Sequence, residues 1–510
     1  MTARYWRVVL VLLWVVTGCD SSEGKGDAGT VVEDGGALED GGTPEDGGPP
    51  EDAGPGDAGT DPLACEKQRG VCAGARRAMV DGAYESECTA LSYGADYESA
   101  ETRCDGLDND CDGVTDPSFA SRVMNVDGPY SSAPTILKTD QGVFVSWEYP
   151  GIRVLRLNTD LVLQEAVTVS MPWEREEGQM QVILHSTLVR TQEGMALVYA
   201  TMASGSRPPL RAYLVPLDDQ GVPKTVPQGE PQEISLLDWQ GGGRSPRVAT
   251  SHEGDRVVVV WATGTSMEPS FQVMGTVTDL QGQVLAAPRV LFTSSEPVTP
   301  RVSSVLWTRD GDVVVVMKDQ KPALSGDIVR VRRFDGNLDP RGEERSFEMP
   351  DEPMALLADL GPARGGPLES LVLVMRSRMG PSWGTQVQVV QNLFSGGTPE
   401  TWTEAPTPQV VWYGALADEG VLRLAWLSEY KDHEAPSPGG DPMLGWTARL
   451  WTQDEGHSPV DRTPGLEDLP LHRYAQWVLM EKLAPRQVGA LYMTSTVEGS
   501  SLDAVRYCTP

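Results

Sequence analysis

A short apolar segment that ends in a large side chain recurs seven times between residues 121 and 510. The segments read VFVSW, ALVY, VVVVW, VVVVM, LVLVM, LRLAW and GALY, and they end at Trp147, Tyr199, Trp261, Met317, Met375, Trp426 and Tyr492. Consecutive end points lie 51 to 66 residues apart. Most segments follow an acidic or glycine turn, and most precede a second strand-like segment such as IRVLRL or QVMGTV. The chain therefore repeats one β-unit.

The repeat predicts a mostly β fold in which residues 119–510 form a β-propeller. Seven blades match the seven units, although six or eight blades also fit this pattern. A string of β-sandwich domains would need larger units than these. The 54 glycines and 39 prolines favour short strands and turns. Continuous apolar runs such as VVVV indicate inner strands that are covered on both faces.

The two ends of the repeat region predict how such a ring closes. The last unit stops at Cys508, just after its second long strand, so an outer strand is missing. The region begins with SRVMNVDG at 121–128, which is similar to the ends of the other units. We infer that residues 122–126 fill the open edge of the last blade, because an unpaired edge strand is otherwise exposed.

The first 18 residues have the features of a signal peptide. Arg4 and Arg7 precede an apolar run, Val8–Val16, that is too short to span a bilayer in the usual way. The run leads into Val16-Thr17-Gly18-Cys19, which resembles the bacterial lipobox. That resemblance implies cleavage before Cys19 and its lipidation. The expected location is the bacterial cell envelope, at the outer membrane or the cell surface, with the membrane as a partner through the anchor.

Residues 19–63 form an expected disordered stalk. Residues 20–63 contain 13 acidic residues and one lysine, and large apolar side chains are almost absent. Such a segment cannot bury enough surface to offset the entropy of ordering. The whole chain carries a net charge of −32, which argues against nucleic acid as a partner because phosphates repel it.

A cysteine-rich module is predicted at residues 64–118. It contains five cysteines, and the only others are Cys19 and Cys508. Export to an oxidising compartment makes disulfides the expected state. Because five is an odd number, either Cys508 bonds back to this module or one of its cysteines is free. We favour the first arrangement, since it ties the C-terminus to the start of the globular region.

The sequence CDGLDNDCDGVTD at 104–116 predicts a calcium loop of the form D-x-D-x-D-G-x-x-D. In such loops alternate side chains point into one concavity, a glycine permits the sharp turn, and a backbone carbonyl adds an oxygen. The glutamate of the EF-hand is missing, because Phe119 stands at that position, and Glu101 is a candidate for a further oxygen. The alternative is a solvated acidic turn. The expected metal ligands are Asp108, Asp110, Asp112, the carbonyl of Val114, Asp116 and Asp105.

The segments GVCAGARR, YESEC, YGADYE and ETRCDGLDNDCDG resemble the MopE-type metal-binding module of bacterial proteins over about a tenth of the chain. This resemblance implies copper binding. Copper prefers imidazole, thiolate or thioether ligands, whereas residues 1–120 contain no histidine. The residues therefore favour calcium as the cofactor and argue against copper. Met79 departs from the pattern, which has a cysteine near that position.

No catalytic residue is predicted. The G-x-S-x-G match at 380–384 is followed by a strand-like segment, so it indicates a hairpin loop instead of a nucleophile elbow. The five histidines show no metal-ligand spacing and are expected at the surface: His185, His252, His433, His457 and His472.

The sequence thus favours a surface-anchored, non-enzymatic lipoprotein. In it, a calcium-stabilised module supports a propeller that binds a polysaccharide or a surface protein. The first alternative is an extracellular polysaccharide hydrolase or lyase with its site on the propeller face. The second alternative is a copper-scavenging surface protein.

Overall fold

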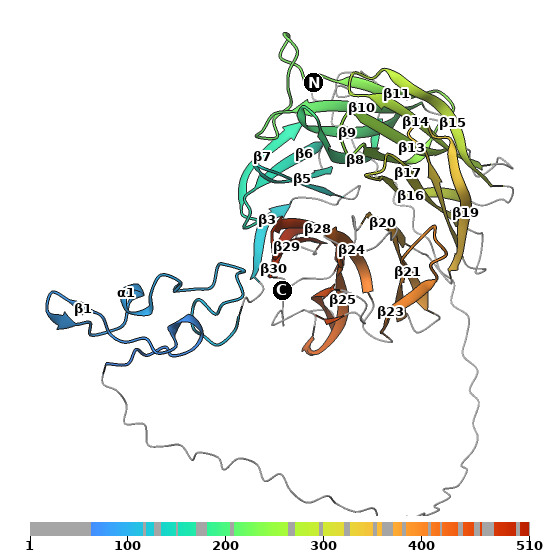
Figure 1. Cartoon of the computed structure of the whole chain (residues 1–510). Helices are drawn as coiled ribbons and strands as arrows, with labels where there is room; N and C mark the ends of the chain where they lie inside the picture. Colours follow the sequence, from blue (N-terminus) through green and yellow to red (C-terminus); the bar gives the residue numbers. More distant parts are fainter. Residues whose placement is uncertain are drawn as a thin grey trace, which may run out of the picture. The chain divides into compact units, whose positions relative to one another are not determined.

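The computed structural model is mostly antiparallel β-structure (Figure 1). It describes residues 63–115, 119–126, 134–148, 151–169, 181–203, 209–263, 271–294, 299–320, 327–349, 354–359, 371–379, 384–405, 410–418, 421–436, 442–452, 460–461, 474–495 and 500–508. Within these ranges, no helix has the length and apolar character needed to cross a membrane.

Seven four-stranded antiparallel sheets follow one another along the described ranges. In six sheets the four strands pair in chain order. The strands of these six sheets are β4 (Thr135–Thr139), β5 (Gly142–Glu148), β6 (Ile152–Leu157), β7 (Leu163–Val169); β8 (Gln181–Thr191), β9 (Gly194–Ala203), β10 (Leu210–Leu217), β11 (Ile234–Trp239); β12 (Arg244–Thr250), β13 (Arg256–Thr263), β14 (Phe271–Asp279), β15 (Val284–Ser294); β16 (Thr299–Trp307), β17 (Val313–Gln320), β18 (Asp327–Phe334), β19 (Pro340–Met349); β20 (Met354–Asp359), β21 (Leu371–Met379), β22 (Gly384–Val390), β23 (Pro399–Ala405); and β24 (Val410–Asp418), β25 (Val421–Pro436), β26 (Pro442–Thr452), β27 (Val460–Asp461).

The last sheet confirms the predicted edge strand. It contains β28 (Tyr474–Ala484), β29 (Gln487–Ser495) and β30 (Ser500–Cys508), and its fourth strand is β3 (Phe119–Val126) from the start of the region. The strand β3 pairs with β30 in antiparallel register, with Arg122 opposite Asp503. Residues 122–126 therefore cover an edge that β30 would otherwise expose.

The recurring apolar segments are the second strands of the sheets, which confirms the prediction that they are inner strands. Residues Val257–Trp261 of β13 are fully buried, because the neighbouring sheets cover both faces of this strand. Some first strands are less apolar, and all five residues of β4 are only half-buried. Their mixed composition explains why the apolar pattern did not reveal them.

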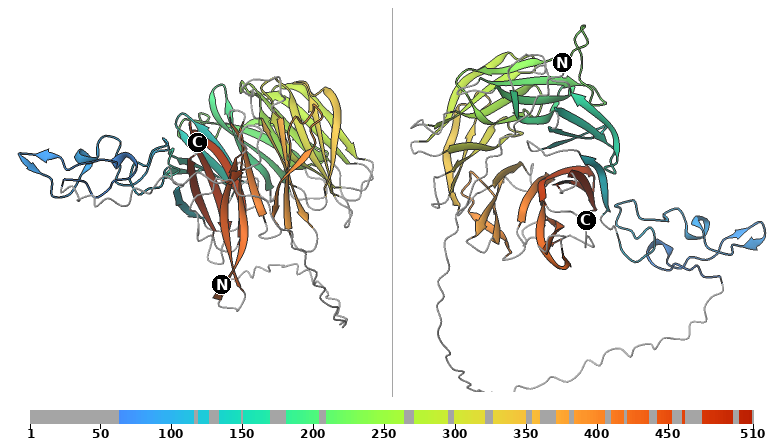
Figure 2. Two further views of the ribbon diagram at one scale, coloured as in Figure 1. Left: turned by 60° about the horizontal axis from the view of Figure 1, so that its bottom comes forward. Right: turned by 180° about the vertical axis from the view of Figure 1, so that it is seen from behind.

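The first strands contact one another in cyclic order: β4, β8, β12, β16, β20, β24, β28 and again β4. Figures 1 and 2 show the sheets following one another in this order, from teal β4–β7 through green and yellow to red β28–β30. Apolar cores fill the spaces between adjacent sheets. Trp147 of β5 packs with Leu491 and Leu502 of the last sheet, whereas Phe144 on the opposite face packs with Leu188 and Leu197 of the next sheet.

Residues 63–115 contain little regular structure. Their elements are η1 (Gly70–Cys72), β1 (Met79–Val80), β2 (Ala83–Tyr84) and α1 (Ala90–Tyr93). The core is small and consists mainly of Cys65, Cys72, Tyr93 and Cys111.

Disulfides account for all five cysteines of this segment and for Cys508. The bonds are Cys65–Cys88, Cys72–Cys111 and Cys104–Cys508. The preferred sequence-based arrangement, in which Cys508 bonds back to the module, is thereby confirmed.

Candidate functional site

The loop that follows Asp108 is curled because the carboxylate of Asp108 accepts hydrogen bonds from backbone N–H groups four and five residues later. Asp108 accepts from the N–H of Asp112 at 3.1 Å and of Gly113 at 2.9 Å. Gly113 has φ = 100°, a conformation that favours glycine. The sequence D-x-D-x-D-G therefore closes on itself, as the calcium-loop pattern predicts.

Three carboxylates converge at this loop. One oxygen each of Glu101, Asp108 and Asp110 lies within 4.8 Å of the other two. Glu101 is 4% exposed and Asp108 is 6% exposed. The backbone N–H of Asn109 donates to Glu101 at 2.7 Å, which holds Glu101 against the loop. Because calcium binds oxygens at about 2.3–2.6 Å, ligands on opposite sides of the ion lie about 5 Å apart, so this spacing fits calcium.

The donor set consists of oxygens. A carboxylate offers about four lone-pair positions, so Asp108 keeps acceptor capacity after binding two N–H groups. Within the described ranges, neither Asp108 nor Asp110 forms an ion pair, and the five cysteines of the module are in disulfides and offer no thiolate. This chemistry suits a hard cation such as calcium better than copper.

The predicted ligands Asp105 and Asp112 are not part of the three-carboxylate cluster. Asp112 is exposed and accepts from the N–H of Val114 at 2.7 Å, which forms a local turn. Asp105 accepts from the N–H of Leu107 at 3.0 Å. Val114 is itself exposed. Asp116, like the predicted lipidation residue Cys19, lies outside the described residues.

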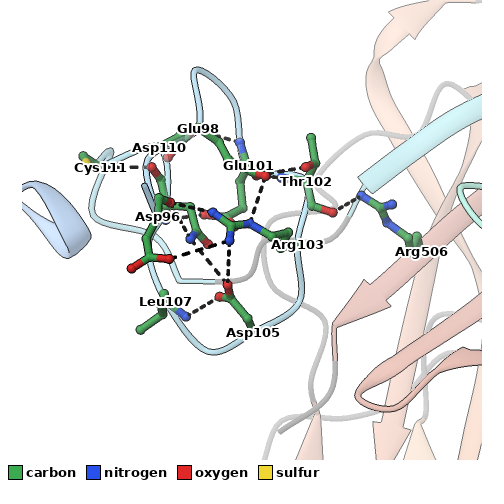
Figure 3. A network of polar contacts seen from close by, with 11 residues as sticks. Asp96, Glu98, Glu101, Thr102, Arg103, Asp105, Leu107, Asp110, Cys111 and Arg506 are labelled. Carbon is green, nitrogen blue, oxygen red and sulfur yellow. Dashed lines mark hydrogen bonds and ion pairs between the residues drawn. The ribbon is translucent and has the colours of Figure 1, made fainter. Parts of the chain in front are cut away.

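The cations beside the cluster bind other acceptors. Lys67 donates to the carbonyl oxygen of Asp110 at 2.6 Å. Arg103 lies among Asp96, Glu98 and Asp105, with its Nε donating to Glu98 at 2.9 Å (Figure 3). Although desolvation acts in the opposite direction, hydrogen bonds from Thr102 and the charge of Arg103 lower the pKa of Glu98.

The segment that carries the cluster is joined to β30. Cys104 is bonded to Cys508, and Nη2 of Arg506 donates to the carbonyl of Thr102 at 3.1 Å (Figure 3). Arg506 also forms an ion pair with Asp160 in the β6–β7 turn. The acidic loop and the edge where β3 meets β30 are therefore connected through a few residues.

The surface prediction is wrong for His185. His185 lies in β8 and is buried, because its strand is packed against neighbouring first strands. Burial, reinforced by the charge of Arg247, lowers the pKa of His185 to about 3. His433 lies within the strand β25. His252 is exposed as expected, and both His457 and His472 lie outside the described residues.

The G-x-S-x-G match joins two paired strands. β21 ends at Met379, β22 begins at Gly384, and these two residues are opposite each other in an antiparallel ladder. This confirms the predicted hairpin setting, and residues 380–383 lie outside the described residues.

No family model matches this sequence, and no curated protein matches it. Among solved structures, the chain is similar to an α-L-arabinanase of Penicillium chrysogenum, with 10% identity, a TM-score of 0.37 and coverage of 64% of this chain and 93% of that one. It is similar to a sialidase of Trypanosoma rangeli, with 11% identity, a TM-score of 0.35 and coverage of 76% and 59%. It is also similar to extracellular domains 1–2 of Drosophila Semaphorin 1a, with 9% identity, a TM-score of 0.38 and coverage of 75% and 88%. At these values the similarities assign no activity.

Proposed function

We propose that the seven sheets form a seven-bladed β-propeller that serves a bacterial envelope lipoprotein as a binding platform. The observation that carries this proposal is the cyclic order of the first strands, in which β28 contacts β4 and β3 completes the last sheet. The partner in this proposal is a polysaccharide or a surface protein. Propellers present the loops of all blades on two faces, which suits such a role by analogy with the fold.

The proposed route to the membrane is the lipid anchor at Cys19 and the acidic stalk at 19–63. The support for it is the sequence alone: a signal-peptide pattern, a lipobox-like site and a run of like charges that extends the chain.

In this proposal the Glu101–Asp108–Asp110 cluster holds calcium in the cysteine-rich module. The ion would supply the positive charge that three neighbouring carboxylates lack. The residues of the chain do the rest: Asp108 closes the loop on the N–H of Gly113, and Asn109 holds Glu101 in place. The competing role, copper scavenging, has less support because the site has an oxygen donor set.

Calorimetric titration of calcium into the oxidised, metal-free full chain tests the cation site. We expect binding that weakens at least about tenfold, or about 1.4 kcal/mol, in Asp110→Asn, because one charged ligand is lost. Glu87→Gln, which removes an exposed acid of the same module, is the matched control and is expected to leave binding unchanged. Absence of calcium binding, or copper binding that Asp110→Asn does not affect, would contradict the assignment.

Affinity electrophoresis in gels containing polysaccharides, followed by an assay for new reducing or unsaturated chain ends, tests the platform. Retardation without new ends is the expected result. Release of new ends would establish the hydrolase or lyase alternative and overturn the non-enzymatic role. Absence of retardation by every polysaccharide would contradict polysaccharide binding itself.

A further inference from the structure

Arg247 is a cation among the first strands, and no carboxylate of the described residues forms an ion pair with it. It lies in β12, the first strand of its sheet, which contacts both β8 and β16. Its Nε donates to the carbonyl oxygen of Ser303 in β16 at 3.3 Å, and its Nη1 donates to the carbonyl oxygen of Pro246 at 2.8 Å. Both acceptors are neutral backbone groups.

The repeat shows that an arginine is unusual at this position. Arg247 is opposite Val260, the residue before the large side chain that ends the apolar run of β13. The equivalent first-strand residues of three other sheets are Thr135, Thr187 and Ser304. Thr135 already links adjacent first strands, because its hydroxyl accepts from the N–H of Leu188 in β8 at 3.0 Å. In the remaining three sheets the equivalent residues are Leu356, Gly414 and Leu479, so the sheets pack without a charged side chain at this position.

The charge of Arg247 stays uncompensated within the described residues. No carboxylate there forms an ion pair with it, and burial alone lowers its pKa. A guanidinium nevertheless keeps its proton at neutral pH and carries five N–H donors. Its two bonds to carbonyl oxygens leave donors unused. Arg247 is only half-buried, so an anion can reach it, and binding that anion would compensate its charge.

The neighbouring side chain limits the charge of that anion. His185 of β8 interacts electrostatically with Arg247 and is neutral at neutral pH, since its pKa is lowered to about 3 by burial and by this arginine. The pair therefore presents one positive charge and one neutral imidazole. One planar guanidinium matches a carboxylate, which has one negative charge and two oxygens, better than it matches a dianionic phosphate.

We propose that Arg247 binds the carboxylate of an acidic saccharide within the ring of first strands, with His185 as its polar neighbour. This inference rests on the proposed polysaccharide-binding function and specifies its ligand as a uronate-containing polymer. The group expected to bind Arg247 is a carboxylate with one negative charge. A free inorganic oxyanion such as phosphate is the competing ligand.

Calorimetric titration of the full chain with trigalacturonate, neutral galactotriose and inorganic phosphate tests the proposal. We expect trigalacturonate alone to bind, with affinity falling at least about tenfold in Arg247→Gln. Arg309→Gln removes the same charge from an exposed turn and is expected to leave binding unchanged. Uronate binding that survives Arg247→Gln, or phosphate binding equal to that of trigalacturonate, would overturn the assignment.

A second test uses the wild-type chain, so it does not require that Arg247→Gln folds. Trigalacturonate is expected to shift the imidazole NMR signals of His185 and to leave those of His252 unchanged. Unchanged His185 signals at saturation would refute the site. If the gels show binding of neutral polysaccharides and Arg247→Gln does not change the affinity for trigalacturonate, only this inference fails. If the chain binds no polysaccharide, the proposed function fails with it.

Discussion

The burial and the charge state of a residue in this chain depend more on the strands packed beside it than on its neighbours in sequence. His185 stands in the polar-looking segment HST, yet it is buried because β8 lies beside the first strands of two adjacent sheets. Burial disfavours the charged imidazolium, and the positive charge of Arg247 disfavours it further.

The pH dependence of stability follows from this shift. The pKa of His185 falls from 6.5 in the unfolded chain to about 3 in the folded one. Below pH 6.5 the unfolded chain therefore takes up a proton that the folded chain does not, and stability falls as the pH drops toward 3. Relative to His185→Gln, wild type is expected to lose up to about 1.4 kcal/mol per pH unit in this window.

Urea unfolding across this pH range measures the difference between wild type and His185→Gln. His252→Gln, in an exposed turn, is the control and is expected to follow wild type. Parallel pH profiles for wild type and His185→Gln would show that His185 is not buried in the neutral form.

The residues of the acidic site were predictable only in part. The spacing of Asp108 and Asp110 indicates side chains on one side of a loop, and both join the cluster. Asp112 has the same spacing but accepts from the N–H of Val114, a local choice that spacing does not encode. The charge at Arg247 gave no sequence signal, because its significance depends on two strands distant in sequence.

At the scale of elements, four sheets have the same type of turn directly after their third strand. In each, an Asp or Asn side chain accepts from the N–H groups two and four residues later. These residues are Asn158, Asp218, Asp279 and Asp335. Such side-chain-to-backbone bonds favour the turn over alternative pairings and so help to fix the register of the outer strand.

Asp279→Ala is expected to destabilise the chain by about 1–2 kcal/mol, because the N–H groups of Gln281 and Gln283 lose their acceptor. Asp279→Asn keeps the accepting oxygen and reproduces the residue found at Asn158, so a much smaller effect is expected. Chemical denaturation of the two variants measures the contrast. If Asp279→Ala and Asp279→Asn lose the same stability, the effect comes from the charge of Asp279 and not from its hydrogen bonds.

Second and third strands were predictable because adjacent sheets cover them and demand apolar residues. The run Val257–Trp261 of β13 is the clearest case. First strands such as β4 are half-buried and mixed in composition, so their sequences lack both the alternation of an exposed sheet and the continuity of a buried strand.

At the scale of the whole molecule, the Cys104–Cys508 disulfide closes a segment of 404 residues. The chain-entropy model gives a stabilisation of about 6 kcal/mol for a loop of this length, as an upper value. The Cys65–Cys88 bond closes only 23 residues within the small module.

The double variant Cys104→Ser, Cys508→Ser is therefore expected to lower the midpoint of thermal unfolding of the sheets. Cys65→Ser with Cys88→Ser should leave that midpoint in place, since it removes a bond only from the module. Differential scanning calorimetry separates the two effects. Equal midpoints for wild type and the first double variant would show that the pairing of β3 with β30 holds the two ends by itself.

The covalent connection between Cys104 and Cys508 also sets how the molecule carries mechanical load. Tension applied from the N-terminal side passes along the chain to Cys104 and can cross there directly to Cys508, near the C-terminal residue. The hydrogen bonds between β3 and β30 lie beyond this junction, so the disulfide bears the tension before they do. When the chain is pulled between its N-terminal side and Cys508, the sulfur bridge thus carries the load in place of the strands that lie between the two cysteines.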